Sequence, residues 1–145
     1  MNRADLQTLT FQGWLPLGLG EETRLMAALP TCFGVYAFVF PGQQVRRIGT
    51  SDIAYIGSAK NQGGLRHRIR GYFHPGYDNR TNIRMQQHMR ENPALMIGYV
   101  DAGSKDRAKL LESDLLLRFE REHGELPPFN KHRQLARLWH TSGAG

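Results

Sequence analysis

Two short apolar segments that lie close together most constrain what this chain can fold into. Residues 33–40 and 53–57 are rich in aromatic and β-branched side chains, so each segment predicts a β-strand. Each segment also carries a glycine and a tyrosine, in the stretches GVY and YIG. The polar linker between them is long for a hairpin loop, so we expect a further short strand at 45–48. The first half of the chain therefore predicts the start of a small sheet.

Helical and extended patterns follow these strands along the chain. We predict a third main strand at 95–100, and helices at 21–29, 65–73, 81–90, 105–123 and 134–139. The helix at 105–123 is the best defined, because Ser104 can cap its start and Gly124 ends it. For residues 1–20 we expect only a short strand or arm. The predicted fold class is α+β (mixed), with a small three-stranded antiparallel sheet flanked by helices.

The size and composition of the chain narrow the class of protein. A length of 145 residues predicts one domain, and the single cysteine, Cys32, excludes an internal disulfide and a cysteine-rich zinc site. The first residues do not resemble a signal peptide, and no apolar run is long enough to span a bilayer. We therefore expect a soluble, cytoplasmic protein that has no membrane partner.

Positive charge is concentrated in one part of the chain. The formal net charge is +6, and the segment from Lys60 to Arg90 contains seven lysines and arginines but one acid, Asp78. This segment alone carries a surplus equal to the whole net charge. A basic patch of this kind attracts polyanions, above all nucleic acids. Solvated helix faces in a generally basic protein explain the same charges equally well.

One carboxylate lies on the apolar side of the predicted helix at 105–123. Glu112 falls within a helical stripe made of Ala108, Leu111, Leu115 and Phe119. A buried carboxylate costs several kcal/mol unless it is paired or bound to a metal. Three interpretations follow for Glu112: a structural salt bridge with an arginine of the basic helix, a position at the exposed end of the stripe, or a functional carboxylate.

One arginine of the helix at 65–73 has a distinctive position. Arg68 lies about 85° from the centre of the apolar stripe of that helix, so it can reach over a sheet surface that bears Tyr36 and Tyr55. His67 and Arg70 are expected to point away from that surface. A guanidinium fork suits a phosphate better than an ammonium does. A surface arginine that merely extends into solvent is the alternative.

Taken in order, these features resemble the GIY-YIG endonuclease family over roughly residues 33–131. The matching elements are GVY at 34–36, YIG at 55–57, Arg68 in HRIRGYF, Glu112 in LLESDLL and Asn130 in PPFN. The resemblance implies one nuclease domain over residues 1–145, with its core at about 33–131, an N-terminal extension at 1–32 and a short C-terminal tail. The chain departs from the family in a longer link between the motif tyrosines and a small insertion at 61–64. Both departures could displace Arg68.

The resemblance implies a metal-dependent endonuclease that hydrolyses phosphodiester bonds in DNA. The implied cofactor is one Mg²⁺ (or Mn²⁺) ion bound by Glu112, and the implied catalytic residues are Tyr36, Tyr55, Arg68, Glu112 and Asn130. Neighbouring basic residues are expected to bind the substrate: Lys60, Arg66, Arg70 and His74. A homodimer or a targeting partner protein is expected to supply specificity, because no separate DNA-binding motif is recognisable.

The sequence leaves open which residue is the general base and which of three functions the protein has. Tyr36 is the first candidate for the general base, although a tyrosine ordinarily has a pKa of about 10, so we expect nearby cations to lower it. His67 or His74 is the alternative base. The alternative functions are a nucleic-acid-binding or adaptor protein that does not cut, and a nuclease of the same fold that acts on RNA.

Overall fold

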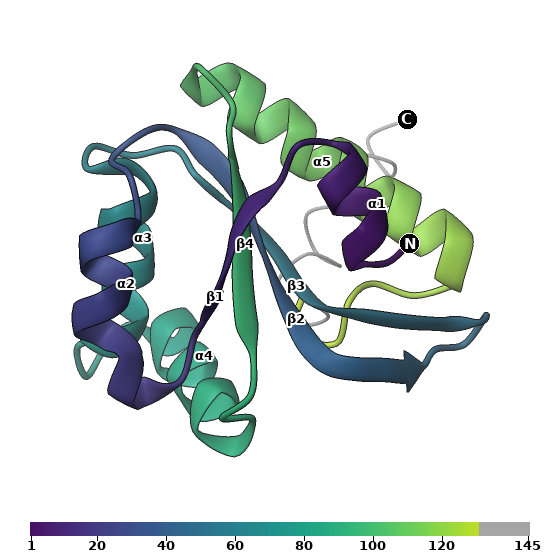
Figure 1. Ribbon diagram of the computed structural model, residues 1–145, viewed down its shortest axis with the longest axis horizontal. Coiled ribbons are helices and arrows are strands. Elements are labelled where there is room, and N and C mark those ends of the chain that lie inside the picture. Colours follow the sequence, from purple (N-terminus) through teal and green to yellow (C-terminus); the bar gives the residue numbers. More distant parts are fainter. Residues whose placement is uncertain (131–145) are drawn as a thin grey trace.

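A four-stranded antiparallel sheet organises the protein in the computed structural model, which describes residues 1–130 (Figure 1). The spatial order of the strands is β1-β4-β2-β3, and their bounds are β1 Gln12–Pro16, β2 Gly34–Val45, β3 Thr50–Ala59 and β4 Met96–Asp101. The predicted α+β class and the three predicted main strands are confirmed.

The predicted number of strands was wrong, because the sheet also contains β1 from the N-terminal segment. β1 has the sequence QGWLP, and Gly13 and Trp14 both have positive φ at an irregularity in its pairing with β4. This irregularity and the proline interrupt the alternation of apolar and polar residues by which a strand is recognised in a sequence. The pairing with β4 makes the segment before residue 33 an integral part of the sheet.

The strand expected at 45–48 was also wrong. β2 continues to Val45 and β3 begins at Thr50, so the two strands form one long hairpin that projects beyond the rest of the sheet (Figure 1). The long link between the motif tyrosines is therefore an extension of the hairpin.

Within residues 1–130, six helical segments surround the sheet. They are α1 Arg3–Thr8, η1 Leu19–Glu21 (a 3₁₀ turn), α2 Glu22–Ala28, α3 Gly64–Phe73, α4 Arg80–Glu91 and α5 Lys105–His123. The helices predicted at 21–29, 65–73, 81–90 and 105–123 are confirmed within two residues, whereas α1 was not predicted. The helix predicted at 134–139 lies outside the described residues. No helix within residues 1–130 is both long enough and apolar enough to cross a bilayer.

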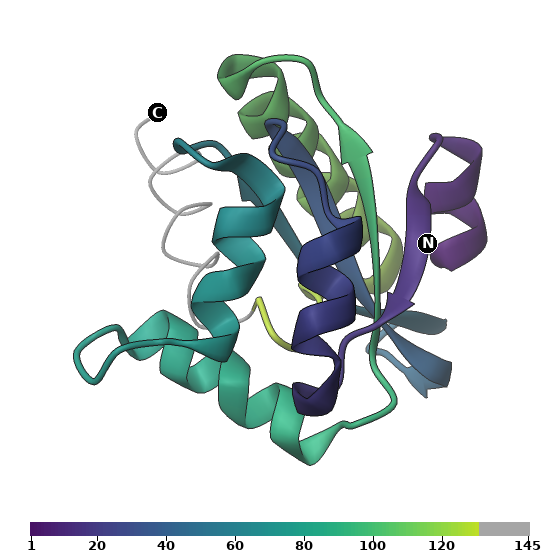
Figure 2. The same ribbon diagram turned by 60° about the vertical axis from the view of Figure 1, so that its left-hand side comes forward.

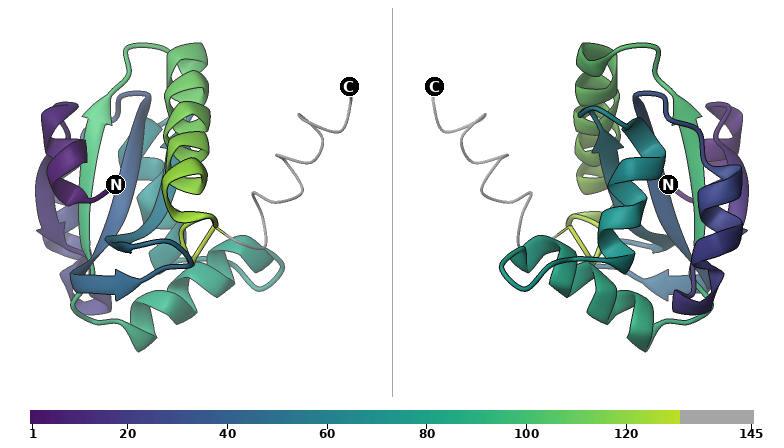
Figure 3. Two further views of the ribbon diagram at one scale, coloured as in Figure 1. Left: turned by 90° about the vertical axis from the view of Figure 1, so that its right-hand side faces the viewer. Right: turned by 90° about the vertical axis from the view of Figure 1, so that its left-hand side faces the viewer.

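Both faces of the central part of the sheet are buried, which explains why residues 34–40 of β2 are apolar without interruption. Tyr36 and Phe38 point to the face covered by α2, α3 and α4, whereas Val35 and Ala37 point to the face covered by α1 and α5. Figures 2 and 3 show these helices on the two sides of the sheet. β3 is an edge strand, so groups from the two faces can meet around it.

Candidate functional site

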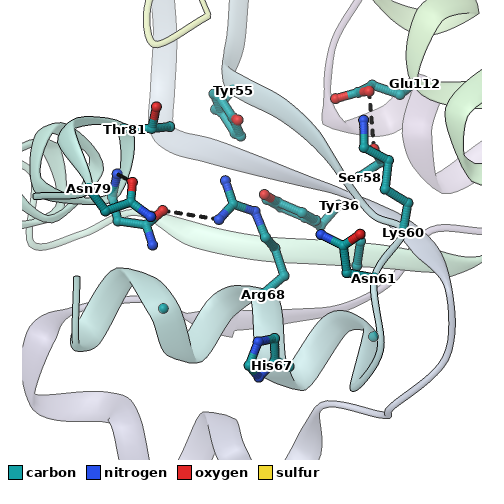
Figure 4. Close-up of a pocket in the computed structure, with 14 residues that line it drawn as sticks. Tyr36, Tyr55, Ser58, Lys60, Asn61, His67, Arg68, Asn79, Thr81 and Glu112 are labelled. Atoms are coloured by element: carbon teal, nitrogen blue, oxygen red, sulfur yellow. Dashed lines mark hydrogen bonds between the residues drawn. The ribbon is translucent and has the colours of Figure 1, made fainter. Parts of the chain in front are cut away.

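A pocket of about 370 Å³ lies at the edge strand β3, where α3, α4 and α5 come close to it (Figure 4). Five of the residues predicted from the sequence line this pocket: Tyr36, Tyr55, Lys60, Arg68 and Glu112. They come from β2, the end of β3, the loop after it, α3 and α5. The pocket therefore brings together groups that are as far apart in the sequence as Tyr36 and Glu112.

The glycines of the two motif stretches allow this close packing. Gly57 pairs with Tyr36 across the β2–β3 ladder, and a Cβ atom at Gly57 would lie 2.7 Å from both the Tyr36 hydroxyl and the Tyr55 ring. A Cβ atom at Gly34 would collide with the Val100 carbonyl oxygen of β4. Any side chain at either position would push the tyrosines or the strands apart.

Three tyrosines form a connected group, of which Tyr36 and Tyr55 line the pocket and Tyr72 lies behind them. The Tyr36 and Tyr72 hydroxyls are hydrogen-bonded at 2.6 Å, and the Tyr36 and Tyr55 rings lie 6.0 Å apart. Tyr72 lies on the buried side of α3 with Leu65 and Ile69, as an ordinary core residue would, so its polar role was not predicted. Its spacing of four residues from Arg68 on α3 is the signal that could have revealed it, because residues i and i+4 meet on a helix.

Arg68 is held in place by two contacts. Its Nη1 atom donates a hydrogen bond of 3.0 Å to Asn82 Oδ1, and its guanidinium carbon lies 4.6 Å from the centre of the Tyr72 ring. Stacking and hydrogen bonding both restrict the planar guanidinium group, so it approaches a ligand in a preset orientation. The insertion at 61–64 has not moved Arg68 out of the pocket.

Burial controls the acidity of the buried tyrosine pair. It raises the pKa of Tyr36 well above the usual tyrosine value, and the charge of Arg68 opposes this shift without overcoming it. Burial raises the pKa of Tyr72 in the same way. In the protein alone, the expectation that nearby cations lower the pKa of Tyr36 is therefore wrong, because removal of the phenol from water has the larger effect.

These shifts predict a loss of stability at alkaline pH. A group with a raised pKa in the folded chain stabilises the fold fully below its unfolded pKa, which is about 10 for tyrosine, and this contribution is lost as the pH rises further. We expect the Tm to fall between about pH 9 and pH 11, and to fall less in Tyr72→Phe, which has one buried phenol fewer. Tyr77→Phe is the control, because Tyr77 is exposed. Equal slopes for all three proteins would contradict the prediction.

Glu112 reaches the pocket from the opposite face of the sheet. Its side chain is 3% exposed, and Ser58 Oγ donates a hydrogen bond of 3.0 Å to its Oε1 atom. Glu112 therefore does not lie at an exposed end of the apolar stripe. Within residues 1–130, no group of three or more His, Cys, Asp and Glu side chains could hold a metal ion. A cation here would have one carboxylate ligand, which fits Mg²⁺ because this ion keeps several waters and also binds substrate phosphates.

Asn130 is buried beside the strand and does not line the pocket. Its Nδ2 atom donates to the Ile56 carbonyl at 2.9 Å, and its Oδ1 atom accepts from the Ile56 amide at 3.0 Å. The side chain thus pairs with the free edge of β3 as a neighbouring strand would. It orders the part of β3 that carries Tyr55 and Gly57.

These two hydrogen bonds predict that Asn130 stabilises the fold and does not contact the substrate. In Asn130→Asp a carboxylate oxygen would face the buried Ile56 carbonyl without a donor, and we expect a loss of about 3 kcal/mol in the free energy of unfolding. Urea denaturation measures this loss. Asn61→Asp, at an exposed position, should change stability by less than about 0.5 kcal/mol. A stable Asn130→Asp protein would refute the structural role.

The other basic residues expected to bind substrate lie outside the pocket. Arg66 donates from Nε to the Leu29 carbonyl at 2.9 Å, and His74 Nε2 lies 2.6 Å from a carboxylate oxygen of Glu22. Arg70 is exposed on α3 and does not line the pocket. His67, which was expected to point away, lines the pocket instead. That expectation was wrong because the pocket extends along the first turn of α3.

The start of α4 forms a wall that the sequence analysis missed. Asn79, Thr81 and Asn82 all line the pocket, and the Asn79 side chain caps the helix by accepting from the Asn82 amide at 3.1 Å. Asn82 also fits closely against Gly71, where a Cβ atom would lie 3.0 Å from Asn82 Nδ2. An asparagine before a helix is a recognisable N-cap signal, so the sequence could have revealed the cap at Asn79. Its position in the same pocket as Arg68 depends on the tertiary structure.

The arginines around the pocket are not neutralised by acids. Within the described residues, none of those between residues 66 and 90 forms an ion pair with a carboxylate: Arg66, Arg68, Arg70, Arg80, Arg84 and Arg90. Their charge therefore acts on the solvent and on any anion that approaches this side of the molecule.

Comparison with known proteins finds a partial match. The chain is 34% identical over 89 residues to the UvrABC system protein C of Gloeobacter violaceus (strain ATCC 29082 / PCC 7421). The match covers 59% of this chain and 11% of that protein, so the chain corresponds to a small part of this relative. No protein-family model matches the chain, and no solved structure matches it.

Proposed function

We propose that this protein is a metal-dependent endonuclease that hydrolyses phosphodiester bonds in DNA. The observation that carries the proposal is that Tyr36, Tyr55, Arg68 and Glu112 meet in one pocket. The arginines beside it form no ion pair with a carboxylate of residues 1–130. The resemblance to GIY-YIG endonucleases and the partial similarity to a UvrABC system protein C support the same class.

In this proposal the exposed arginines attract the DNA, and Arg68 binds the phosphate that is cleaved. Arginines that are not paired with acids attract the DNA backbone and release its counterions. The guanidinium group of Arg68, oriented by Asn82 and Tyr72, can donate two hydrogen bonds to one phosphate. Negative charge grows on that phosphate as water attacks, so Arg68 would stabilise the transition state more than the bound substrate.

Glu112 is the residue that would hold Mg²⁺ or Mn²⁺. Ser58 fixes the orientation of the carboxylate by donating to Oε1, which prepares an oxygen ligand at the pocket wall. A bound divalent ion would supply a Lewis acid for the phosphate and lower the pKa of its bound water. Burial of Glu112 keeps bulk water from competing strongly at this carboxylate.

Tyr36 is our proposed base for the attacking water. Its raised pKa makes the phenolate scarce at neutral pH, so the cleavage rate should rise with pH as the phenolate fraction grows. Tyr72 can donate a hydrogen bond to that phenolate across the 2.6 Å contact and so stabilise it. Tyr55 would hydrogen-bond a phosphate oxygen or the water. His67, at the pocket wall, is the alternative base.

A set of cleavage assays tests this proposal against the two alternatives. The protein is incubated with plasmid, branched DNA, single strands and structured RNA, in Mg²⁺, in Mn²⁺ and in chelator. We expect DNA cutting that requires the metal. Salt-sensitive binding without cutting in any metal would support the adaptor instead, and preferential loss of RNA would support the RNA nuclease. Size-exclusion chromatography with and without DNA tests whether the protein forms a homodimer, one of the two sources of specificity expected from the sequence.

A further inference from the structure

An exposed aromatic residue stands on the loop between α3 and α4. Tyr77 is 96% exposed, and within residues 1–130 it makes no ring contact and no side-chain hydrogen bond. The loop projects away from the body of the protein (Figure 2). Aromatic side chains gain free energy when they are removed from water, so an exposed ring that has no partner in the folded chain is available to a ligand.

The loop is attached to the protein at both ends, and its second end lies at the pocket. His74 is paired with Glu22 at one end, and the Asn79 side chain caps α4 at the other. Tyr77 precedes Asn79, a pocket residue, by two positions, so their Cα atoms are at most about 7.6 Å apart. The backbone that carries Tyr77 therefore lies close to the pocket wall at Asn79.

The surroundings of Tyr77 favour a nucleic acid as its ligand. Arg80 and Arg84 follow it on α4, both are exposed, and neither forms an ion pair with a carboxylate in the described part of the chain. Single-stranded nucleic acids bind where cationic groups track the backbone and aromatic rings stack on the bases. Tyr77 and these two arginines have the required combination.

We propose that Tyr77 stacks on an unpaired nucleobase next to the phosphodiester bond held in the pocket. This inference rests on the proposed function and specifies its substrate class. In an intact duplex each base face is covered by its neighbours, so a protruding ring finds a partner only where a base is unpaired, extruded or terminal. The preferred substrate is therefore DNA with a single-stranded or disrupted segment at the cleavage site.

Binding to three fluorescently labelled DNAs tests the inference without requiring cleavage. The probes are a single strand, a duplex with one unpaired 2-aminopurine, and the intact duplex, each in chelator. We expect Tyr77→Ala to weaken binding of the first two probes by about tenfold and to leave the intact duplex unchanged. Wild type should quench the 2-aminopurine emission, and Tyr77→Ala should not.

Two variants serve as matched controls. Tyr77→Phe keeps the ring and should behave as wild type. Val45→Ala changes a residue that is 80% exposed on the β2–β3 hairpin, and it should bind all three probes normally. Equal affinities of Tyr77→Ala and wild type for every probe would overturn the inference, and so would an equal loss on all three. A change in oligomeric state on substitution would assign Tyr77 to a protein contact instead.

The outcomes separate this inference from the proposed function. Loss of single-strand binding in Tyr77→Ala, in a protein that cuts nothing, would refute the endonuclease and keep the stacking role. Normal metal-dependent cleavage, with no effect of Tyr77→Ala on the binding of any probe, would support the endonuclease and refute the stacking role of Tyr77.

Discussion

Glutamine in place of Glu112 is expected to reduce DNA cleavage by at least about a thousandfold, with little loss of DNA binding. Glu112 is the carboxylate that lines the pocket, so its neutral analogue removes the anionic ligand proposed for the metal. Glutamine keeps the shape of the side chain and an oxygen that can accept from Ser58, so folding should be preserved. Single-turnover cleavage in Mg²⁺ and thermal unfolding measure the two effects.

Asp114→Asn is the matched control for this substitution. It removes the same charge from the same helix at an exposed position, so its cleavage rate should equal that of wild type. If Glu112→Gln cuts normally while folded, the carboxylate has a structural role and the metal site must be sought elsewhere. If both variants lose activity equally, the loss reflects the change in the net charge of the protein and does not show that Glu112 binds a metal.

Alanine in place of Arg68 is expected to lower the cleavage rate by between about a hundredfold and a thousandfold. Removal of the guanidinium group takes away the cation that stacks on Tyr72, and with it the stabilisation of charge that develops on the phosphate. Lysine should restore little activity, because it lacks the planar fork that donates to Asn82 and stacks on Tyr72.

Two further variants separate orientation of Arg68 from its charge. Asn82→Ala leaves the guanidinium group of Arg68 in place but removes the hydrogen bond that orients it. We therefore expect kcat to fall less than it does in Arg68→Ala. Arg121→Ala removes an exposed cation from α5 and should leave the rate unchanged. Full activity of Arg68→Lys would show that a point charge is sufficient and would refute the proposed role of orientation.

The sequence predicted most accurately those elements whose start, end and buried face are all marked by residues within the element or next to it. The helix at 105–123 has a capping serine, a terminal glycine and an apolar stripe, and all of these act within a few residues of one another. The burial of Glu112 followed from its position in that stripe. The strands that carry GVY and YIG were recognisable because both faces of the sheet need apolar side chains.

The sequence by itself determined the fold class, the concentration of positive charge and the residues from which a site could be assembled. Only the tertiary structure decided how they are used: β1 joins β4, Tyr72 bonds to Tyr36, and Asn130 pairs with the edge of β3. Each of these contacts joins residues that are more than 30 positions apart, so no local pattern encodes it. The direction of the Tyr36 pKa shift depended on the same packing, because burial in the assembled core outweighs the nearby positive charge.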